Sequence, residues 1–243
     1  MTRITDAIKH LIIINVIVFV APQLMQLDFS NILALHFPMN EKFGFWQYVS
    51  HMFIHGSFSH ILFNMYGLWA FGSPLEQMWG RNKFIFFYFS AGLGAAIIYT
   101  LVNYYQFNGI YDLFMNAGLN KTEIISILEA AKTNDQRVIN AVTQEQFDKI
   151  IGLYNTSAVG ASGAVYGVLV AFGMYFKDAK LMMIFLPVPI AAKYFIPILI
   201  AIDFFFGMTN YSIGNIAHFA HIGGALIGFL VAWYWKKNQF KQF

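Results

Sequence analysis

The sequence predicts an all-helical integral membrane protein in which six helices cross the bilayer. Of its 243 residues, 58% are hydrophobic and only 11% are charged, whereas about a quarter of the residues in a soluble domain are charged. Several apolar stretches approach 20 residues, the length that a helix needs to cross about 30 Å of hydrocarbon. A water-soluble core is therefore a poor description of this chain.

Six apolar stretches set the expected spans. The first is the weakest, because Pro22, Gln23 and Gln26 interrupt it. We expect it to be a retained span, since the charged start, apolar stretch and cleavage site of a signal peptide do not follow one another there. The loop after it mixes aromatic and polar residues, which is typical of the membrane interface. The expected spans are residues 8–27, 58–79, 84–105, 157–176, 190–208 and 214–235.

Residues 106–156 form a polar insertion between the third and fourth spans. The insertion holds six acidic and four basic residues, so it must lie in water. The helical spacing of Ile124, Ile127 and Leu128 predicts one or two short amphipathic helices on or beside the membrane. We expect residues 1–243 to form a single membrane-embedded domain, with this insertion outside the membrane.

The distribution of positive charge predicts the orientation. With the N-terminus in the cytoplasm, ten of the 15 Lys and Arg residues fall in cytoplasmic segments and five fall outside. Positive residues are enriched in cytoplasmic loops, so we expect both termini to be cytoplasmic and the insertion to be external.

The composition also excludes several classes of function. The formal net charge is +3, and no Lys/Arg run is dense enough for binding nucleic acid. The chain has no cysteine, so disulfides, thiolate metal sites and cysteine nucleophiles are excluded.

Polar residues on three of the spans share one depth. The second, fourth and sixth spans all run from outside to inside, and each has polar residues within about its first eight positions. These residues are His60 and Asn64, Ser162, and His221. Polar groups inside a membrane are costly and usually face the interior of a bundle or a water-filled cavity. We therefore expect these four side chains to meet.

Their chemistry fits an activated serine. A hydroxyl at Ser162 and an imidazole at His221 supply a nucleophile and a base that works near neutral pH. His60 and Asn64 lie four residues apart on one helical face and are able to donate hydrogen bonds to an oxyanion. Tyr166 lies one turn beyond Ser162, where it is expected to pack against the His221 ring.

Glycines on the fourth and sixth spans allow this meeting. Gly163 and Gly167 on one span and Gly224 and Gly228 on the other form two small-xxx-small pairs, which let helix backbones approach closely. Such an approach would let Ser162 and the His221 ring form a direct hydrogen bond.

Three motifs, in this order, resemble the rhomboid family of intramembrane serine proteases. They are H-x-x-x-N at His60 and Asn64, G-x-S-G at residues 160–163, and A-H-x-x-G-x-x-x-G at residues 220–228. The resemblance covers nearly the whole chain and implies a six-helix rhomboid-like bundle. It also implies a Ser–His dyad, without an acidic third member, that cleaves transmembrane or juxtamembrane segments of membrane proteins.

The resemblance assigns a role to each matching residue. It implies that Ser162 is the nucleophile and His221 the general base, and that His60, Asn64 and the Ser162 backbone N–H form the oxyanion hole. It implies no cofactor and no metal, membrane-protein substrates and the lipid bilayer as partners, no nucleic acid, and a place in the bacterial inner membrane. It also implies that four further residues support the site: Tyr166, Gly160, Gly163 and Gly224.

Smaller features agree with the resemblance or depart from it. His55 and Glu76 match positions of the family, whereas a Trp-Arg pair that is common in its first loop is Trp46-Gln47 here. The insertion is also long for simple bacterial members. Members of the wider fold that lack the dyad bind membrane clients without cutting them, and this non-proteolytic role is the alternative function.

Other polar residues offer alternatives to this site. His218 lies three residues before His221 and is a second candidate base, although we expect it to be supporting polar structure. Asp203 completes the chain order of a soluble α/β-hydrolase triad, but no strand precedes the serine, so we expect Asp203 to be structural. A zinc protease is disfavoured, because Met52 stands where an H-E-x-x-H motif starting at His51 would carry its glutamate.

Overall fold

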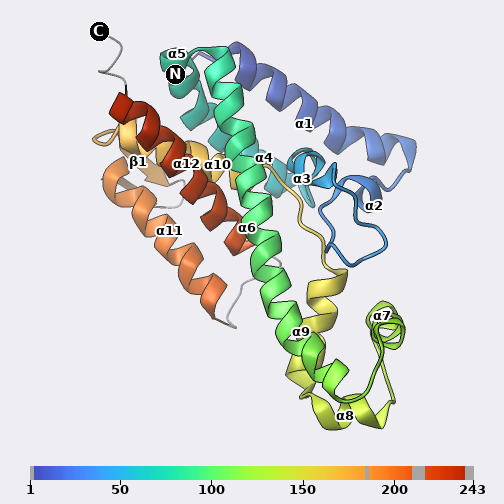
Figure 1. Ribbon diagram of the computed structural model, residues 1–243. Coiled ribbons are helices and arrows are strands. Elements are labelled where there is room, and N and C mark those ends of the chain that lie inside the picture. The colour runs from blue at the N-terminus through green and yellow to red at the C-terminus, as the bar shows by residue number, and fades with distance from the viewer. Residues whose placement is uncertain (1–2, 184–185, 210–216, 239–243) are drawn as a thin grey trace.

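A computed structural model of the chain describes residues 3–183, 186–209 and 217–238. It is mainly helical, and its long helices form a bundle from which α6 runs out toward α7, α8 and α9 (Figure 1). The elements in chain order are α1 (Asp6–Met25), α2 (Ser30–Leu33), α3 (Gln47–Ser50), η1 (His51–Phe53), α4 (Phe58–Gly67), η2 (Leu68–Gly72), α5 (Ser73–Trp79), α6 (Arg81–Asn116), α7 (Lys121–Ala130), α8 (Gln136–Ala141), α9 (Gln144–Asn155), α10 (Ser162–Tyr175), β1 (Lys180–Met183), β2 (Leu186–Ala191), α11 (Ala192–Met208) and α12 (His218–Asn238).

Helices lie in all six stretches that the sequence analysis assigned to spans. Within the described residues, α1 and α6 are long and apolar enough to cross a membrane by length and composition alone. The second stretch is one helical run that the π-helical turn η2 divides into α4 and α5. Helix α10 is apolar but has 14 residues. Residues 214–216, at the expected start of the sixth span, lie outside the described residues.

Helix α10 packs against α6 on one side and α12 on another. A Cβ atom at Gly224 would lie 1.9 Å from the carbonyl oxygen of Gly163, and one at Gly228 would lie 2.5 Å from the Cα of Gly167. No side chain fits in either contact, so the two backbones touch where these glycines meet. The glycine pairs that the sequence singled out therefore face each other across α10 and α12.

Glu76 ties the start of α1 to α5. One carboxylate oxygen accepts a hydrogen bond from the backbone N–H of Ala7 at 2.8 Å, and the other accepts from Ile8 at 3.1 Å and from the Thr5 hydroxyl. The backbone N–H groups of Ala7 and Ile8 belong to the first turn of α1, where the helix itself supplies no carbonyl oxygen to accept from them. A buried acid there also complements the positive end of the helix dipole.

The prediction of an all-helical chain is wrong at residues 180–191. Strands β1 and β2 form an antiparallel hairpin in which Lys180 pairs with Ala191, so the expected span at 190–208 begins as strand and becomes helix at Ala192. Pro187 and Pro189 lie in β2, and proline has no N–H for a helical hydrogen bond. A two-stranded sheet has only edge strands, which tolerate proline.

The insertion contains more structure than the sequence predicted. Helix α6 continues to Asn116, and three helices follow instead of one or two. Asn120 and Thr143 begin α7 and α9 as capping boxes. Side chains of α7, α8 and α9 share a buried cluster with the end of α6, whose members include Phe107, Phe114, Ile124, Leu128, Val138 and Ile150.

Candidate active site

Ser162 is the first residue of α10, so this helix starts later than the expected span at residue 157. The chain just before it is extended and is held by backbone hydrogen bonds. Leu35 and Ala158 exchange two of them, both 2.9 Å long. Because the loop after α1 fixes this segment, the helix does not begin earlier, and the half-buried Ser162 is the first residue of an otherwise apolar helix.

Glycines on both sides of Ser162 give it room. Gly160 has a φ of +115°, a conformation that other residues rarely adopt, and a Cβ there would lie 2.6 Å from Nε2 of His60. Its N–H donates to the carbonyl oxygen of His51 at 2.9 Å. At Gly163, a Cβ would lie 2.5 Å from that of Ala95. The G-x-S-G motif is therefore required by the local backbone and packing.

The structure brings Ser162 and His221 together. The Nε2 atom of His221 lies 2.8 Å from Oγ of Ser162, although 59 positions separate them in the chain. His221 lies in the first turn of α12, and its side chain is 12% exposed. The two residues meet where the glycines of α10 and α12 let the backbones touch.

Tyr166 packs flat against the His221 ring. The ring centroids are 4.2 Å apart and the planes differ by 9°. Tyr166 lies one helical turn past Ser162 on α10, which is the placement that the sequence analysis expected. The stack limits the tilt of the imidazole in its contact with Ser162.

Asp203 of α11 reaches the same histidine, and the sequence analysis did not assign it to the site. Its Oδ1 atom lies 3.2 Å from Nδ1 of His221 and 2.5 Å from Nδ1 of His218, and its Oδ2 atom accepts a hydrogen bond from the Tyr166 hydroxyl. Ser162, His221 and Asp203 thus form one hydrogen-bonded chain, although the resemblance implies a dyad without an acidic third member. The available signal was a lone acid in an apolar helix, which is costly unless paired.

The contacts of His221 indicate its tautomer. The Nδ1 atom faces a carboxylate oxygen, which only accepts hydrogen bonds, so Nδ1 carries the proton. In a neutral ring Nε2 is then an acceptor, and it faces the Ser162 hydroxyl. This proton assignment follows from the hydrogen-bond network and is the one that a general base requires.

His60 and Asn64 lie on α4 next to the segment that precedes Ser162. The His60 ring is close to Gly160, and the side-chain amide of Asn64 donates to the carbonyl oxygen of His60 at 2.9 Å. Ser57 caps the helix by accepting from the His60 N–H at 3.2 Å. Because α4 begins at Phe58, both residues lie in its first two turns. The His60 ring reaches the segment before α10, whereas the Asn64 amide bonds a carbonyl of its own helix.

One group among the described residues has the donor set of a metal site. The ligand atoms of Asp203, His218 and His221 all lie within 4.8 Å of one another, and two imidazoles with a carboxylate suit Zn²⁺. The separations of 2.5 and 3.2 Å between them are those of hydrogen bonds. His51 and His55, the pair that the sequence analysis considered for a zinc protease, do not belong to this group.

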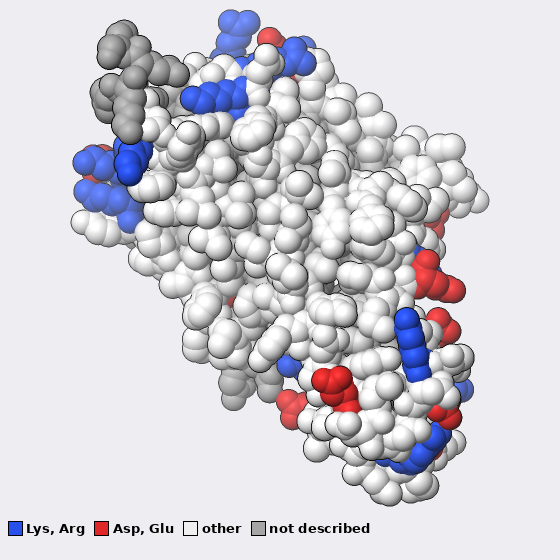
Figure 2. Space-filling view, viewed as in Figure 1, with Lys and Arg blue, Asp and Glu red and all other residues white. Residues whose placement is uncertain are grey.

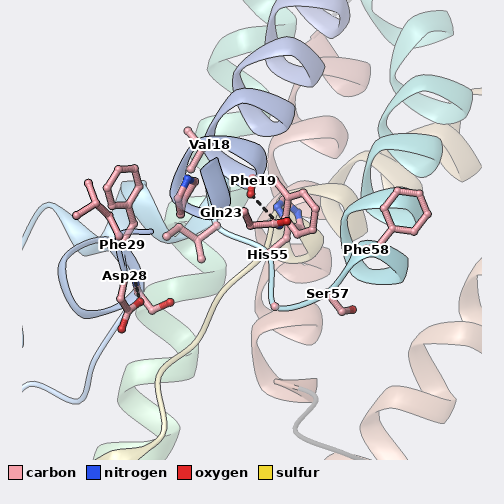
Figure 3. A pocket seen from close by; sticks show the side chains of 13 residues that line it. Val18, Phe19, Gln23, Asp28, Phe29, His55, Ser57 and Phe58 are labelled. Carbon is pink, nitrogen blue, oxygen red and sulfur yellow. Dashed lines mark hydrogen bonds between the residues drawn. The ribbon is translucent and has the colours of Figure 1, made fainter. Parts of the chain in front are cut away.

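A cavity of about 520 Å³ lies between the end of α1 and the start of α4. Figure 3 shows its lining, which includes Phe19 and Gln23 of α1, His55 of the loop before α4, and Phe58 at the start of α4. Ser162 does not line it. The His55 ring lies 5.0 Å, centroid to centroid, from the ring of His60, so the cavity adjoins the outer side of the candidate site.

The family model of the rhomboid domain matches residues 42–117 and 136–238, which is most of the chain. The chain belongs to the rhomboid family. The resemblance drawn from the three motifs is thus confirmed, and every candidate site residue falls inside the matched ranges. Residues 118–135, which contain α7, fall between them.

Two relatives show how distant the similarity is. The rhomboid is 25% identical over 191 residues to "Rhomboid protein 1, mitochondrial" of Saccharomyces cerevisiae, with 78% of this chain and 42% of the relative covered. It is 24% identical over 193 residues to "Rhomboid protease AarA" of Providencia stuartii, with 77% and 54% covered. The chain spans about half the length of these curated relatives.

Proposed function

We propose that this rhomboid is an intramembrane serine endopeptidase that cleaves transmembrane or juxtamembrane segments of other membrane proteins. The observation that carries the proposal is the 2.8 Å contact between Oγ of Ser162 and Nε2 of His221. A serine hydroxyl bonded to a base that a third group orients is the arrangement of an activated nucleophile. The name of the Providencia stuartii relative supports the same activity.

The contacts support a two-step hydrolysis. In the first step, Ser162 Oγ attacks the carbonyl carbon of the scissile bond while its proton passes to Nε2 of His221, which then protonates the departing amine. In the second step, His221 takes a proton from water as the water oxygen attacks the ester carbonyl, and Nε2 then returns this proton to Oγ of Ser162 as the ester bond breaks. Nε2 thus serves first as base and then as acid, and the resting tautomer is restored.

The oxyanion of each step needs donors. As the first residue of α10, Ser162 has a backbone N–H without an acceptor in its own helix. The His60 ring lies next to Gly160, two residues before Ser162, and Asn64 lies one turn further along α4. We assign these three groups to the oxyanion hole, where losing one donor typically slows catalysis by about a hundredfold or more.

The surface supports a place in the membrane with six crossings. Lys and Arg gather at the end that holds α5 and the C-terminal end of α12, whereas the end with α7, α8 and α9 carries both acidic and basic side chains, with a mainly uncharged band between the two ends (Figure 2). Exposed apolar side chains occur along α1, α6, α11 and α12. With the basic end in the cytoplasm, the site opens toward the outer leaflet of what we infer to be a bacterial inner membrane.

An active-site probe tests the proposed activity. A fluorophosphonate reacts only with an activated serine, so we expect it to label the purified rhomboid and not Ser162→Ala or His221→Ala. The same variants should fail to cleave a fluorogenic peptide with a membrane-spanning sequence in detergent micelles. Labelling that persists in Ser162→Ala would show that another residue reacts, and the proposal would be wrong.

The alternative is a rhomboid that binds membrane clients without cutting them. It requires only the bundle and not the contact between Ser162 and His221. If the wild-type protein is folded in detergent but neither cleaves peptide nor reacts with the probe, this binding role is favoured.

A further inference from the structure

We propose that Asp203 is a positioning residue for His221: its carboxylate holds the ring in the orientation and tautomer in which Nε2 accepts the Ser162 proton. This inference rests on the proposed function. It departs from a two-residue site, because Asp203 contributes a third side chain to the same hydrogen-bonded chain. The proposal stands on contacts from three helices, α10, α11 and α12.

Three donors meet at this one carboxylate. The ring N–H groups of His218 and His221 point at Oδ1, and the Tyr166 hydroxyl donates to Oδ2. Asp203 is only 7% exposed, so water does not replace these partners. A buried carboxylate is stable when several donors satisfy it, and here each donor belongs to the surroundings of the candidate base.

Asp203 supplies a constraint that the Tyr166 stack does not. A flat stack limits tilting of the His221 ring, but it does not distinguish the two ring nitrogens, since either of them stacks equally well. The acceptor at 3.2 Å from Nδ1 does distinguish them. Asp203 thus decides which nitrogen is free to take a proton from Ser162.

His218 and Tyr166 hold the carboxylate itself. The His218 ring bonds the same Oδ1 atom at 2.5 Å, and the Tyr166 hydroxyl bonds the other oxygen. With both oxygens engaged from α10 and α12, the Asp203 side chain has one orientation toward His221. This explains why a second histidine lies three residues before the base without contacting Ser162 in the structure.

The negative charge of Asp203 also stabilises the positive charge that forms on His221 during the reaction. When Ser162 gives its proton to Nε2, the His221 ring carries one positive charge, and the proton on Nδ1 remains between Nδ1 and the carboxylate. Asp203 accepts no proton in this step and stays anionic. In a site of low dielectric constant such a pair is stronger than it would be in water.

Kinetics of Asp203→Asn form the first test. The amide has the same size, but its NH₂ group is able to donate to Nδ1 and so favour the wrong tautomer. We expect kcat on the membrane-spanning peptide to fall by at least about 100-fold, against roughly 10⁴-fold for the equivalent change in soluble triads, with KM changed by less than about threefold. Asp203→Glu should recover part of the lost activity.

Asp178→Asn is the matched control. Asp178 is an exposed acid that bonds Lys193 at 2.8 Å, away from the site. We expect this variant to keep wild-type kcat and KM. If Asp203→Asn also retains more than about a third of wild-type kcat, Asp203 does not position the base, and the proposal is wrong.

A spectroscopic measurement separates positioning from folding. With ¹⁵N-labelled histidine, nitrogen chemical shifts report which ring nitrogen carries the proton, and the signal of His221 is identified by its loss in His221→Gln. We expect a proton on Nδ1 in the wild type and on Nε2 in Asp203→Asn, at an unchanged unfolding temperature. A folded Asp203→Asn protein that still has its proton on Nδ1 would overturn the proposal.

Different experimental results would contradict the positioning role of Asp203 and the proposed peptidase function. An inactive wild type that is not labelled by fluorophosphonate would contradict the peptidase function, yet the tautomer of His221 would still report on Asp203. An active wild type with a fully active Asp203→Asn variant would leave the peptidase function intact and remove only the positioning role.

Discussion

At the scale of single residues, Tyr166 has two separate contacts with the candidate site. Its ring stacks on His221, and its hydroxyl bonds the carboxylate that faces the same histidine. Aromatic stacking and a buried hydrogen bond each contribute about 1 kcal/mol. The two contacts are separable by substitution, because phenylalanine keeps the ring and loses only the hydroxyl.

We therefore expect two substitutions at Tyr166 to differ in effect. Tyr166→Phe should lower kcat by no more than about tenfold, since one of three donors to Asp203 is lost. Tyr166→Ala should lower it by about 100-fold or more, because the His221 ring also loses its stacking surface. Cleavage of the membrane-spanning peptide measures both. Equal losses in the two variants would show that the stack contributes nothing beyond the hydroxyl.

The sequence predicts some residues of the site better than others. Ser162, His221 and Tyr166 were placed correctly relative to one another, because helical spacing and the glycine pairs fix which residues of α10 and α12 can meet. Asp203 was not placed, because apolar α11 has no comparable pattern that fixes its rotation about its axis. Its charge was visible in the sequence, but its partners follow only from the packing of three helices.

At the scale of helices and strands, the contact between α10 and α12 controls the site. These helices carry Ser162 and His221, and their glycines touch within the same turns. A Cβ at Gly224 would overlap the carbonyl oxygen of Gly163 at 1.9 Å, and neither atom belongs to a flexible side chain. Any side chain at Gly224 must therefore push the helices apart.

We expect Gly224→Ala to lower both stability and activity. Separating the helices breaks the close packing of α10 and lengthens the bond between Ser162 and His221. The expected cost is a few kcal/mol, as for other overpacked cores. Thermal unfolding in detergent measures the first effect and fluorophosphonate labelling measures the second.

Gly109→Ala is the matched control for this substitution. A Cβ at Gly109, also inside a helix, would meet nothing within 4 Å. Alanine favours a helix over glycine by about 1 kcal/mol, so this variant should be as stable as the wild type or more so. A Gly224→Ala protein that matches it in stability and labelling would contradict the role given to the glycine contact.

Several boundaries of elements could not be predicted from hydropathy. The start of α10 depends on hydrogen bonds between residues 35 and 158, which are far apart in sequence. The strands β1 and β2 were not predicted, and the last two residues of β2 were taken as the start of a span. The two prolines of β2, which are poor helix formers, precede that expected start. The insertion was recognised as polar, but its helix α8 has only six residues and depends on a core shared with α6.

At the scale of the whole molecule, the charged residues separate into two ends. The end with α5 and the last turn of α12 is mainly basic, whereas the end with α7, α8 and α9 carries both acidic and basic side chains (Figure 2). This pattern is the structural counterpart of the orientation that Lys and Arg counting predicted.

Single cysteines can test that orientation, because the chain has none of its own. Lys132 follows α7 and Lys237 lies in the last turn of α12, and both side chains are exposed. In spheroplasts of a bacterial host, a membrane-impermeant maleimide should label Lys132→Cys. It should label Lys237→Cys only after permeabilisation. The reverse pattern would show the opposite orientation.

The length of α6 has a consequence for the proteins that this rhomboid is able to approach. With 36 residues, the helix extends for about 54 Å, whereas the hydrocarbon layer is about 30 Å thick. In the proposed orientation, the remainder extends beyond the membrane on the external side, where α7, α8 and α9 lie (Figure 1). Under the proposed function, we therefore expect clients with a slender or unstructured stalk to approach the site more readily than clients with a bulky folded ectodomain close to the lipid.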